Sequence, residues 1–356
     1  MDFKGWCVNL KKTKIGYFPL SPDLSHPGDR RRLGFWAEKR GIQLHINPET
    51  KMDLIVVSEK SDIFKIHNRH KNTPIIYDLI DGYLVSKDPI QDSIRASAKF
   101  LTKEISKFAL KYTNYVAREC ELATSVVCST FEQSLKIKKF NSNVNVILDS
   151  HEEFPAAIGG SSSSSKGPLL WEGMPFTLSA IHKLRLSLET LADLRINVVT
   201  DLQYFRILGK YSPSSTNSLL RSNLGKYNSQ TALIPWSKEN LVHSAKESSI
   251  AVLPIDLDDP IQLYKAENRL LIMWRLGLPC LVSPTLAYSR VLKQLGLDLL
   301  CVTPSEWLEK ISLLQSSNSL RNESVQIGQQ YLSDFHTSEL ILRKWDRVIE
   351  EALDVY

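Results

Sequence analysis

The stretch that decides the fold spans residues 248–284 and reads SSIAVLPIDLDDPIQLYKAENRLLIMWRLGLPCLVSP. Its apolar run 250–253 ends at Pro254, which is typical of a buried strand, and 280–282 forms a second run of the same kind. Between them, apolar residues recur at helical spacing up to Gly277, whose freedom to adopt positive φ suits a helix end. The stretch therefore predicts a strand, a long polar loop, a short helix and a second strand.

The start of this predicted helix, near residues 267–270, is suited to an anion. A helix N-terminus offers free backbone N–H groups and a partial positive charge, which together attract phosphate. Lys265 and Arg269 would add to that attraction. An ordinary strand–helix–strand crossover with a charged, solvated turn explains the same pattern, and periodicity alone favours that simpler interpretation.

The residue string resembles the C-terminal domain of GT-B-type glycosyltransferases, especially family four. The shared features are a Pro-containing loop, a Lys, an Asn-Arg pair, an apolar helix and a Gly-Leu-Pro end, here Pro254, Lys265, Asn268-Arg269, Leu270-Leu271 and Gly277-Leu278-Pro279. In that family the segment binds the nucleotide diphosphate of a sugar donor. Many members carry a second Glu about one turn before the Gly-x-Pro, where this chain has Ile272, and the nearby Glu is Glu267.

The resemblance extends to two strand-end loops of the second half of the chain. Gly173 would permit close approach to the donor phosphates, and Trp236 lies where an aromatic ring packs near the nucleotide base. Core packing is an equally plausible role for Trp171 and Trp236. The resemblance thus implies a donor-binding set made of Gly173, Trp236, Pro254, Lys265, Glu267, Asn268, Arg269 and Leu270.

The bulk properties of the 356-residue chain fit two globular domains. The net charge of +5 fits an anionic ligand or a membrane surface and does not indicate a nucleic-acid partner. The five cysteines lack CxxC spacing, which indicates reduced thiols in a cytosol. No apolar run is long enough to cross a bilayer, so we expect a cytoplasmic protein that is soluble or peripheral at the cytoplasmic face of the inner membrane.

Strand and helix patterns alternate along the whole chain. Strands are expected at 14–20, 41–46, 53–57, 73–81, 123–128, 144–148, 168–171, 196–200 and 231–236, besides the two above. Helices are expected at 29–40, 92–115, 178–194, 241–246, 304–314 and 340–353. This alternation predicts an α/β fold with two Rossmann-like, doubly wound domains facing a central cleft.

A Ser/Gly-rich stretch, 159–167, suggests where the domains separate. We expect an N-terminal acceptor domain over 1–154 and a C-terminal nucleotide-sugar domain over 155–337. The C-terminal helix, 338–356, is expected to pack back on the first domain, because its apolar face needs a partner surface.

Loops at the C-terminal ends of parallel strands hold the ligands of open α/β sheets. In the first domain these loops contain His26 and Asp81, which we expect to orient the acceptor hydroxyl as catalytic groups. The alternative, nearly as plausible, is that His26 braces a Pro-Gly turn and Asp81 caps the next segment. Residues 30–32, three arginines in a row, are interpreted as a solvated helix start.

Metal and cofactor signals are weak. Asp256 and Asp258 form an Asp-x-Asp pair after a strand, but the pair lies deep in the second half and is interpreted as a solvated loop. No His/Cys cluster has zinc spacing and no GxGxxG is present. We therefore expect no metal site and no cofactor, the nucleotide-sugar being a substrate.

The resemblance implies transfer of a sugar from a nucleotide-sugar donor to a glycan or lipid-linked acceptor. It further implies retention of configuration, independence from metal, and a role in bacterial surface polysaccharide or lipopolysaccharide synthesis. Two alternatives remain open at this point: a non-hydrolysing sugar-nucleotide epimerase of the same architecture, and a non-catalytic two-lobed ligand-binding protein.

Overall fold

The computed structural model describes residues 10, 12–157, 167–204 and 214–354, which divide into two compact units. The first unit comprises Met1–Ser150, Asp259–Lys265 and His336–Tyr356, and the second comprises His151–Asp258 and Ala266–Phe335. Residues 159–166 of the Ser/Gly-rich stretch lie outside the described residues.

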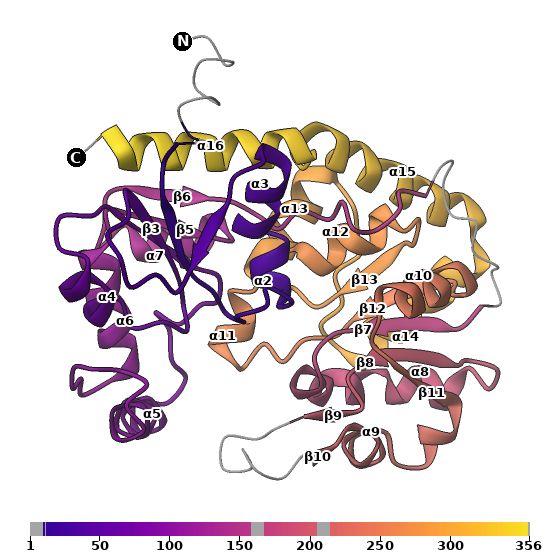
Figure 1. Cartoon of the computed structure of the whole chain (residues 1–356). Helices are drawn as coiled ribbons and strands as arrows, with labels where there is room; N and C mark the ends of the chain where they lie inside the picture. The colour runs from indigo at the N-terminus through magenta and orange to yellow at the C-terminus, as the bar shows by residue number, and fades with distance from the viewer. Residues whose placement is uncertain (1–9, 11, 158–166, 205–213, 355–356) are drawn as a thin grey trace. The chain divides into compact units, whose positions relative to one another are not determined.

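The first unit is built on a six-stranded parallel sheet in the order β2-β1-β3-β4-β5-β6. Strands β3, β5 and β6 of this sheet are labelled in Figure 1. The strands are β1 (Ile15–Phe18), β2 (Leu44–Ile46), β3 (Leu54–Ser58), β4 (Ile75–Leu79), β5 (Ser125–Cys128) and β6 (Val144–Val146). The helices are α2 (Pro27–Arg30), α3 (Leu33–Arg40), α4 (Ile63–Arg69), α5 (Pro89–Leu101), α6 (Tyr112–Leu122), α7 (Phe131–Ile137), α11 (Pro260–Leu263) and α16 (Ser338–Asp354). The strand order reverses between β1 and β3, which makes that position the topological switch point.

Both faces of this sheet are covered, as a parallel sheet requires. Alternate residues of β3 belong to different clusters: Ile55 and Val57 pack with α6, whereas Leu54 and Val56 pack with α3 and α16. The side chains that alternate along one strand therefore fill two separate cores. This arrangement is the doubly wound α/β architecture that the alternating sequence pattern predicts.

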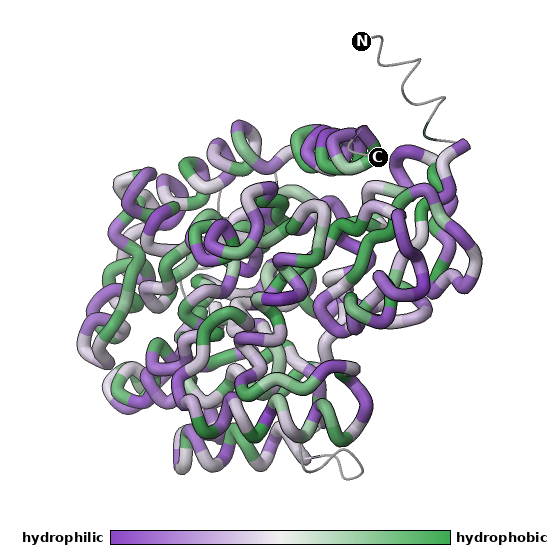
Figure 2. Tube along the Cα trace, turned by 90° about the vertical axis from the view of Figure 1, so that its left-hand side faces the viewer, coloured by the Kyte–Doolittle hydropathy of each residue, from purple (hydrophilic) through white to green (hydrophobic). Residues whose placement is uncertain are grey.

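Helix α16 belongs to the first unit although it ends the chain. It carries both hydrophobic and hydrophilic residues (Figure 2), and Trp345 and Ile349 are fully buried in the cluster that includes Trp36 of α3. The indole N–H of Trp36 donates to Asp346 at 2.7 Å, and Arg40 pairs with the same carboxylate. Apolar burial and this buried polar contact together attach α16 to α3.

The second unit is built on a five-stranded parallel sheet in the order β11-β8-β7-β12-β13, with a small antiparallel pair of strands beside it. The strands are β7 (Leu169–Glu172), β8 (Ile196–Thr200), β9 (Gln203–Tyr204), β10 (Ser214–Ser215), β11 (Thr231–Pro235), β12 (Ile250–Leu253) and β13 (Cys280–Val282). The helices are η1 (Pro175–Leu184), α8 (Arg185–Thr190), α9 (Thr216–Leu224), η3 (Gly225–Gln230), α10 (Lys238–Glu247), α12 (Asn268–Arg275), α13 (Leu286–Leu295), α14 (Pro304–Ser316) and α15 (Asn318–Phe335). Here the order reverses between β7 and β12.

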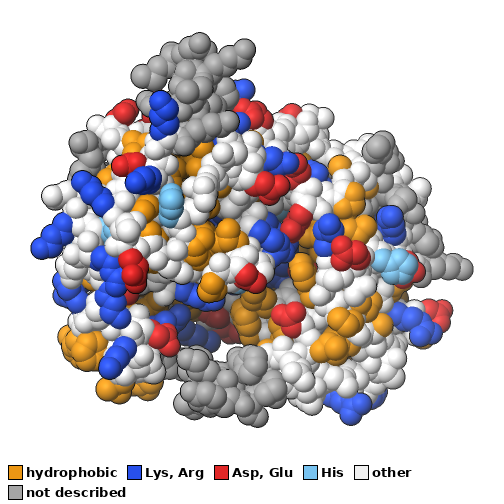
Figure 3. All heavy atoms as spheres, in the orientation of Figure 1, with side chains coloured by type: hydrophobic (Ala, Val, Ile, Leu, Met, Phe, Trp, Pro, Cys, Tyr) orange, Lys and Arg blue, Asp and Glu red, His pale blue; other side chains and the backbone are white. Residues whose placement is uncertain are grey.

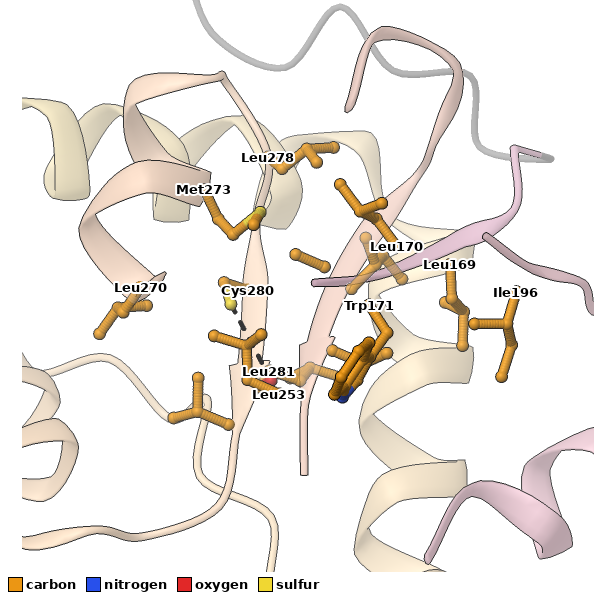
Figure 4. Packing of buried hydrophobic residues seen from close by; sticks show 14 of the residues in the cluster. Leu169, Leu170, Trp171, Ile196, Leu253, Leu270, Met273, Leu278, Cys280 and Leu281 are labelled. Atoms are coloured by element: carbon orange, nitrogen blue, oxygen red, sulfur yellow. Dashed lines mark hydrogen bonds between the residues drawn. The ribbon is translucent and has the colours of Figure 1, made fainter. Parts of the chain in front are cut away.

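One core fills the second unit. Trp171 lies within it, and Met273 of α12 points toward β13 (Figure 4). Helix α15 approaches α12 closely because Gly328 has no side chain: a Cβ there would lie 2.2 Å from the ring of Trp274. Trp171, for which core packing and a ligand role were equally plausible, is a core residue.

Three sequence predictions of helices are wrong in detail. The helix expected at 92–115 is two helices, α5 and α6, because Lys103 adopts a positive φ of 60° that a helix cannot contain. The helix expected at 178–194 is a 3₁₀ segment followed by α8, which ends at Thr190. The helix expected at 29–40 is interrupted at Arg32, whose φ of −118° and ψ of −110° turn the chain.

Candidate functional site

The switch point of the second unit lies between β7 and β12, and the loops that follow these strands hold several of the predicted donor-binding residues. Gly173 directly follows β7, and a Cβ there would lie 2.7 Å from Nη1 of Arg269. The same guanidinium nitrogen donates to the carbonyl oxygen of Glu172 at 2.9 Å. The structure therefore brings Gly173 and Arg269 together, and only glycine leaves room for this contact.

The N-terminus of α12 lies at this arginine, and the first amides of a helix have no intrahelical acceptor. The first intrahelical hydrogen bond runs from the amide of Leu271 to the carbonyl of Glu267, so the amides of 268–270 precede it. The side chain of Leu270 is fully buried in the core, which leaves its amide as the group that can meet a ligand. Three amides, the helix dipole and one guanidinium form an arrangement that favours an anion.

Two further predicted donor-binding residues at this helix start are engaged with protein groups. The carboxylate of Glu267 is buried and pairs with Arg290 at 2.9 Å. The amide oxygen of Asn268 lies 3.2 Å from Nε2 of His151, which donates to it in the tautomer with Nε2–H. These contacts hold the first turn of α12 in place.

Trp236 connects the end of β11 with the end of β7. Its indole N–H donates to Oε1 of Glu172 at 3.0 Å. The other carboxylate oxygen, Oε2, is buried and has no hydrogen-bond partner among the residues that the structure describes. Because an unsatisfied buried carboxylate oxygen is costly, Glu172 is a candidate ligand group that the sequence patterns did not single out.

Pro254 is buried at the end of β12, beside a lysine that the sequence patterns also missed. The amide of Ile255 donates to the hydroxyl of Ser283 at 2.9 Å, and its carbonyl accepts from Nζ of Lys183 at 2.8 Å. Burial lowers the pKa of Lys183, against the opposing effect of Asp256 and Asp258. The amide of Asp258 donates to Asp256 at 3.1 Å, so the Asp-x-Asp pair closes its own turn.

In the first unit, His26 follows β1 and caps helix α2. Its Nδ1 accepts the N–H of Gly28 at 3.1 Å, which leaves Nε2 to carry the proton of the neutral ring. Burial lowers the pKa of His26, and the positive charge of Lys60 lowers it further. The turn-bracing role is therefore present, and the neutral ring keeps an N–H that could meet an acceptor.

Asp81, the other predicted catalytic residue, follows β4 and forms an ion pair with Lys265 at 3.3 Å. The sequence patterns gave these residues different roles, but the structure places both in the first unit, in contact with each other. Glu59, after β3, accepts the amides of Ile80 and Asp81 at 2.9 and 2.8 Å. Burial, assisted by the carboxylate of Asp81, raises the pKa of Glu59 to about 8.

The interpretation of the arginines at 30–32 as a solvated helix start is wrong for Arg32, which is fully buried, and for Arg31, which is nearly so. Nη2 of Arg32 pairs with Asp78 at 2.6 Å, and Nη1 donates to the carbonyl of Ile147 at 2.6 Å and pairs with Asp149 at 3.3 Å. The chain turns inward at Arg32 because these acceptors stand at the ends of two strands. The guanidinium thereby joins the ends of β4 and β6 beneath the loops.

Within the described ranges, no group of three or more His, Cys, Asp or Glu side chains is placed to hold a metal ion. None of the helices in the described part of the chain has the length and apolar character that crossing a membrane requires.

No protein-family model and no curated protein sequence matches this chain. Several solved structures resemble it at low sequence identity. TarM is 12% identical with a TM-score of 0.61, over 83% of this chain and 54% of its own. WaaG, a glycosyltransferase involved in lipopolysaccharide biosynthesis, is 12% identical with a TM-score of 0.54, over 96% of this chain and 99% of its own. HepE from Anabaena, solved with UDP and glucose, is 10% identical with a TM-score of 0.62, over 95% of this chain and 99% of its own.

This chain spans about half the length of TarM and nearly all of WaaG and HepE. At these identities the resemblance is one of fold. The two parallel sheets and their connections agree with it, and the chain has the fold of the GT-B glycosyltransferases.

Proposed function

We propose that the chain transfers a glycosyl group from a nucleotide-sugar to an acceptor hydroxyl. The observation that carries this proposal is the constellation at the β7/β12 switch point: three helix-start amides, the guanidinium of Arg269 and the bare backbone of Gly173. Phosphate groups are the ligands that such a constellation suits best. The fold shared with glycosyltransferases makes a nucleotide-sugar the first ligand to consider.

The donor is proposed to be a UDP-sugar. HepE was solved with UDP, and a TarM variant from S. aureus was also solved with UDP. In the orientation that we propose, the diphosphate meets the start of α12, and the base lies near Trp236. The free buried oxygen of Glu172 would then accept a hydroxyl of the nucleoside.

The departing diphosphate develops negative charge as the glycosidic bond breaks. Preorganised donors that face this charge stabilise the transition state more than the ground state. Arg269 and the amides of 268–270 would supply this stabilisation. We propose that these groups take the place that a divalent cation has in metal-dependent enzymes, and that the transfer retains the anomeric configuration.

The acceptor is assigned to the loops of the first unit. His26 carries an N–H at Nε2 that can donate to the acceptor. The carboxylate of Asp81 pairs with Lys265, and a hydroxyl of the substrate could replace this lysine as its partner. We propose that these side chains orient the acceptor, a glycan or a lipid-linked sugar of a bacterial surface polysaccharide or lipopolysaccharide. The similarity in fold to WaaG, a glycosyltransferase involved in lipopolysaccharide biosynthesis, supports this class of product.

Two arginines on the same helix provide a matched test of the donor site. Arg269 stands at the start of α12 and Arg275 at its end, and each donates to a backbone carbonyl, that of Glu172 and that of Phe154. By isothermal titration calorimetry with UDP, Arg269→Gln should weaken binding about ten- to a hundredfold, since a charge-assisted contact contributes roughly 1.5–3 kcal/mol. Arg275→Gln should leave UDP affinity unchanged. Equal affinities in the two variants would contradict the proposed donor site.

A further inference from the structure

Helix α5 exposes its apolar face to solvent. Ile90, Ile94 and Leu101 recur at helical spacing and are 71%, 62% and 79% exposed. The residues of α5 that are buried instead are Asp92 and Ala96. A surface helix of a globular protein normally has the opposite arrangement, with its apolar stripe facing the core.

The polar inner face of α5 is held by specific contacts, so this orientation is not accidental. The carboxylate of Asp92 accepts the hydroxyl of Thr113 at 2.7 Å. The guanidinium of Arg95 lies 4.6 Å from the ring centre of Tyr83 and 4.4 Å from that of Tyr112, within cation–π range. Turning the helix to bury its isoleucines would break all of these interactions, so the apolar face remains outside.

The loop 102–111 continues the same apolar surface. Phe108 and Leu110 are 55% and 73% exposed, and Phe108 packs edge to face against Phe100 at 5.7 Å, which joins the loop to the end of α5. In Figure 3, hydrophobic side chains gather at the lower left, where Figure 1 places α5. We call this set the α5 surface; its members are Ile90, Ile94, Phe100, Leu101, Phe108 and Leu110.

The segment that carries the α5 surface has an excess of positive charge. Residues 87–111 include six basic and three acidic side chains. The acids are engaged: Asp92 is buried, Asp88 caps the amide of Ile90 at 2.8 Å, and Glu104 pairs with Lys99 at 2.8 Å. The lysines at 87, 103, 107 and 111 are exposed. Exposed apolar side chains that are flanked along the chain by exposed lysines complement a bilayer, whose interior is apolar and whose headgroups are anionic.

We propose that the α5 surface docks on a lipid bilayer with anionic headgroups, with α5 lying in the plane of the interface. Isoleucine, leucine and phenylalanine side chains would enter the acyl boundary while the lysines contact headgroup phosphates. This inference goes beyond the proposed function and does not depend on it, because it concerns a surface of the first unit and no catalytic group.

The test is flotation of the full chain with vesicles of phosphatidylcholine alone, and with vesicles of equal parts phosphatidylcholine and phosphatidylglycerol. The wild type should bind the anionic vesicles more strongly. The variant Ile90→Ser/Ile94→Ser should bind them about tenfold or more weakly, since two large apolar contacts are lost. A matched control, Val302→Ser/Leu313→Ser, changes two apolar residues of the second unit that are each 50% exposed and should bind as the wild type does.

The lysines are tested separately with Lys87→Gln/Lys103→Gln/Lys111→Gln, which should remove most of the preference for anionic vesicles. The control variant Lys238→Gln/Lys246→Gln changes two exposed lysines of the second unit and should keep the preference for anionic vesicles. All variants should keep the wild-type unfolding temperature, because the replaced side chains are exposed. The proposal is overturned if wild type does not bind vesicles, if the control and α5 variants bind equally, or if sedimentation shows self-association that Ile90→Ser/Ile94→Ser abolishes.

Discussion

Adding one methyl group at Gly173 should weaken UDP binding by displacing Arg269. In Gly173→Ala the new Cβ would stand 2.7 Å from Nη1 of Arg269 and 3.1 Å from Cη2 of Trp171. The indole is locked in the core, whereas the guanidinium is the end of a flexible side chain, so Arg269 must move. Its 2.9 Å hydrogen bond to the carbonyl of Glu172 is then lost.

The magnitude follows from that one contact. A hydrogen bond to a charged group contributes about 1.5–3 kcal/mol, so UDP affinity should fall roughly ten- to a hundredfold if the same guanidinium holds the diphosphate. The assay is calorimetry on a double-mutant cycle of wild type, Gly173→Ala, Arg269→Gln and the double variant. Since both changes act through one group, the second should add little, with a coupling energy of about 1–3 kcal/mol.

Additive effects of the two substitutions on UDP affinity would refute the proposed coupling between Gly173 and Arg269. If Gly173→Ala reduced UDP affinity by the same factor with and without Arg269, the glycine would act on the ligand directly and not through the guanidinium. Urea unfolding of each variant serves as the control, because the close approach to Trp171 also costs stability and must be separated from the loss of binding.

Three further predictions concern the first unit. Arg32→Met should lower the free energy of unfolding by about 3–5 kcal/mol, measured with urea, because Asp78 is left buried without its partner; a loss under about 1 kcal/mol would contradict this role. The pKa of Glu59 is raised to about 8 in the folded protein. The protonated carboxyl therefore contributes its full stabilisation below the pKa of the unfolded chain, and this contribution is lost as the pH rises through 8. Measured by urea unfolding between pH 5 and 9, the free energy of unfolding should therefore decline less steeply with pH in Glu59→Gln than in the wild type. The same decline in both proteins would disprove the raised pKa. His26→Gln and Asp81→Asn should each reduce turnover strongly with UDP affinity nearly unchanged; wild-type turnover in both, with a verified donor and acceptor, would exclude them as catalytic groups.

Strands β12 and β13 could be predicted from sequence to the residue, whereas the prediction for β7 began and ended one residue too early. Both β12 and β13 are fully buried and parallel, so their sequences are unbroken apolar runs that stop at Pro254 and Pro284. Helix α15 was missed because its sequence is mostly polar, and it contacts α12 along a narrow line that includes Gly328. A single glycine in a polar sequence does not indicate such a contact between helices.

Side chains whose role depends on distant partners could not be predicted. Arg32 is 46 residues from Asp78 and 117 from Asp149, so nothing local distinguishes it from a solvated arginine. Glu59 becomes notable only because the chain after β4 presents two amides to it. The same holds for α5, whose apolar stripe predicts a helix but gives no indication that the stripe faces solvent.

The most direct test is a crystal structure of the protein with UDP bound. We expect the diphosphate oxygens to accept hydrogen bonds from the backbone amides of 268–270 and from the guanidinium of Arg269, beside the bare backbone of Gly173. We expect the base to lie near Trp236. A diphosphate bound away from the start of α12, or no bound nucleotide at a saturating concentration of UDP, would contradict the proposed donor site.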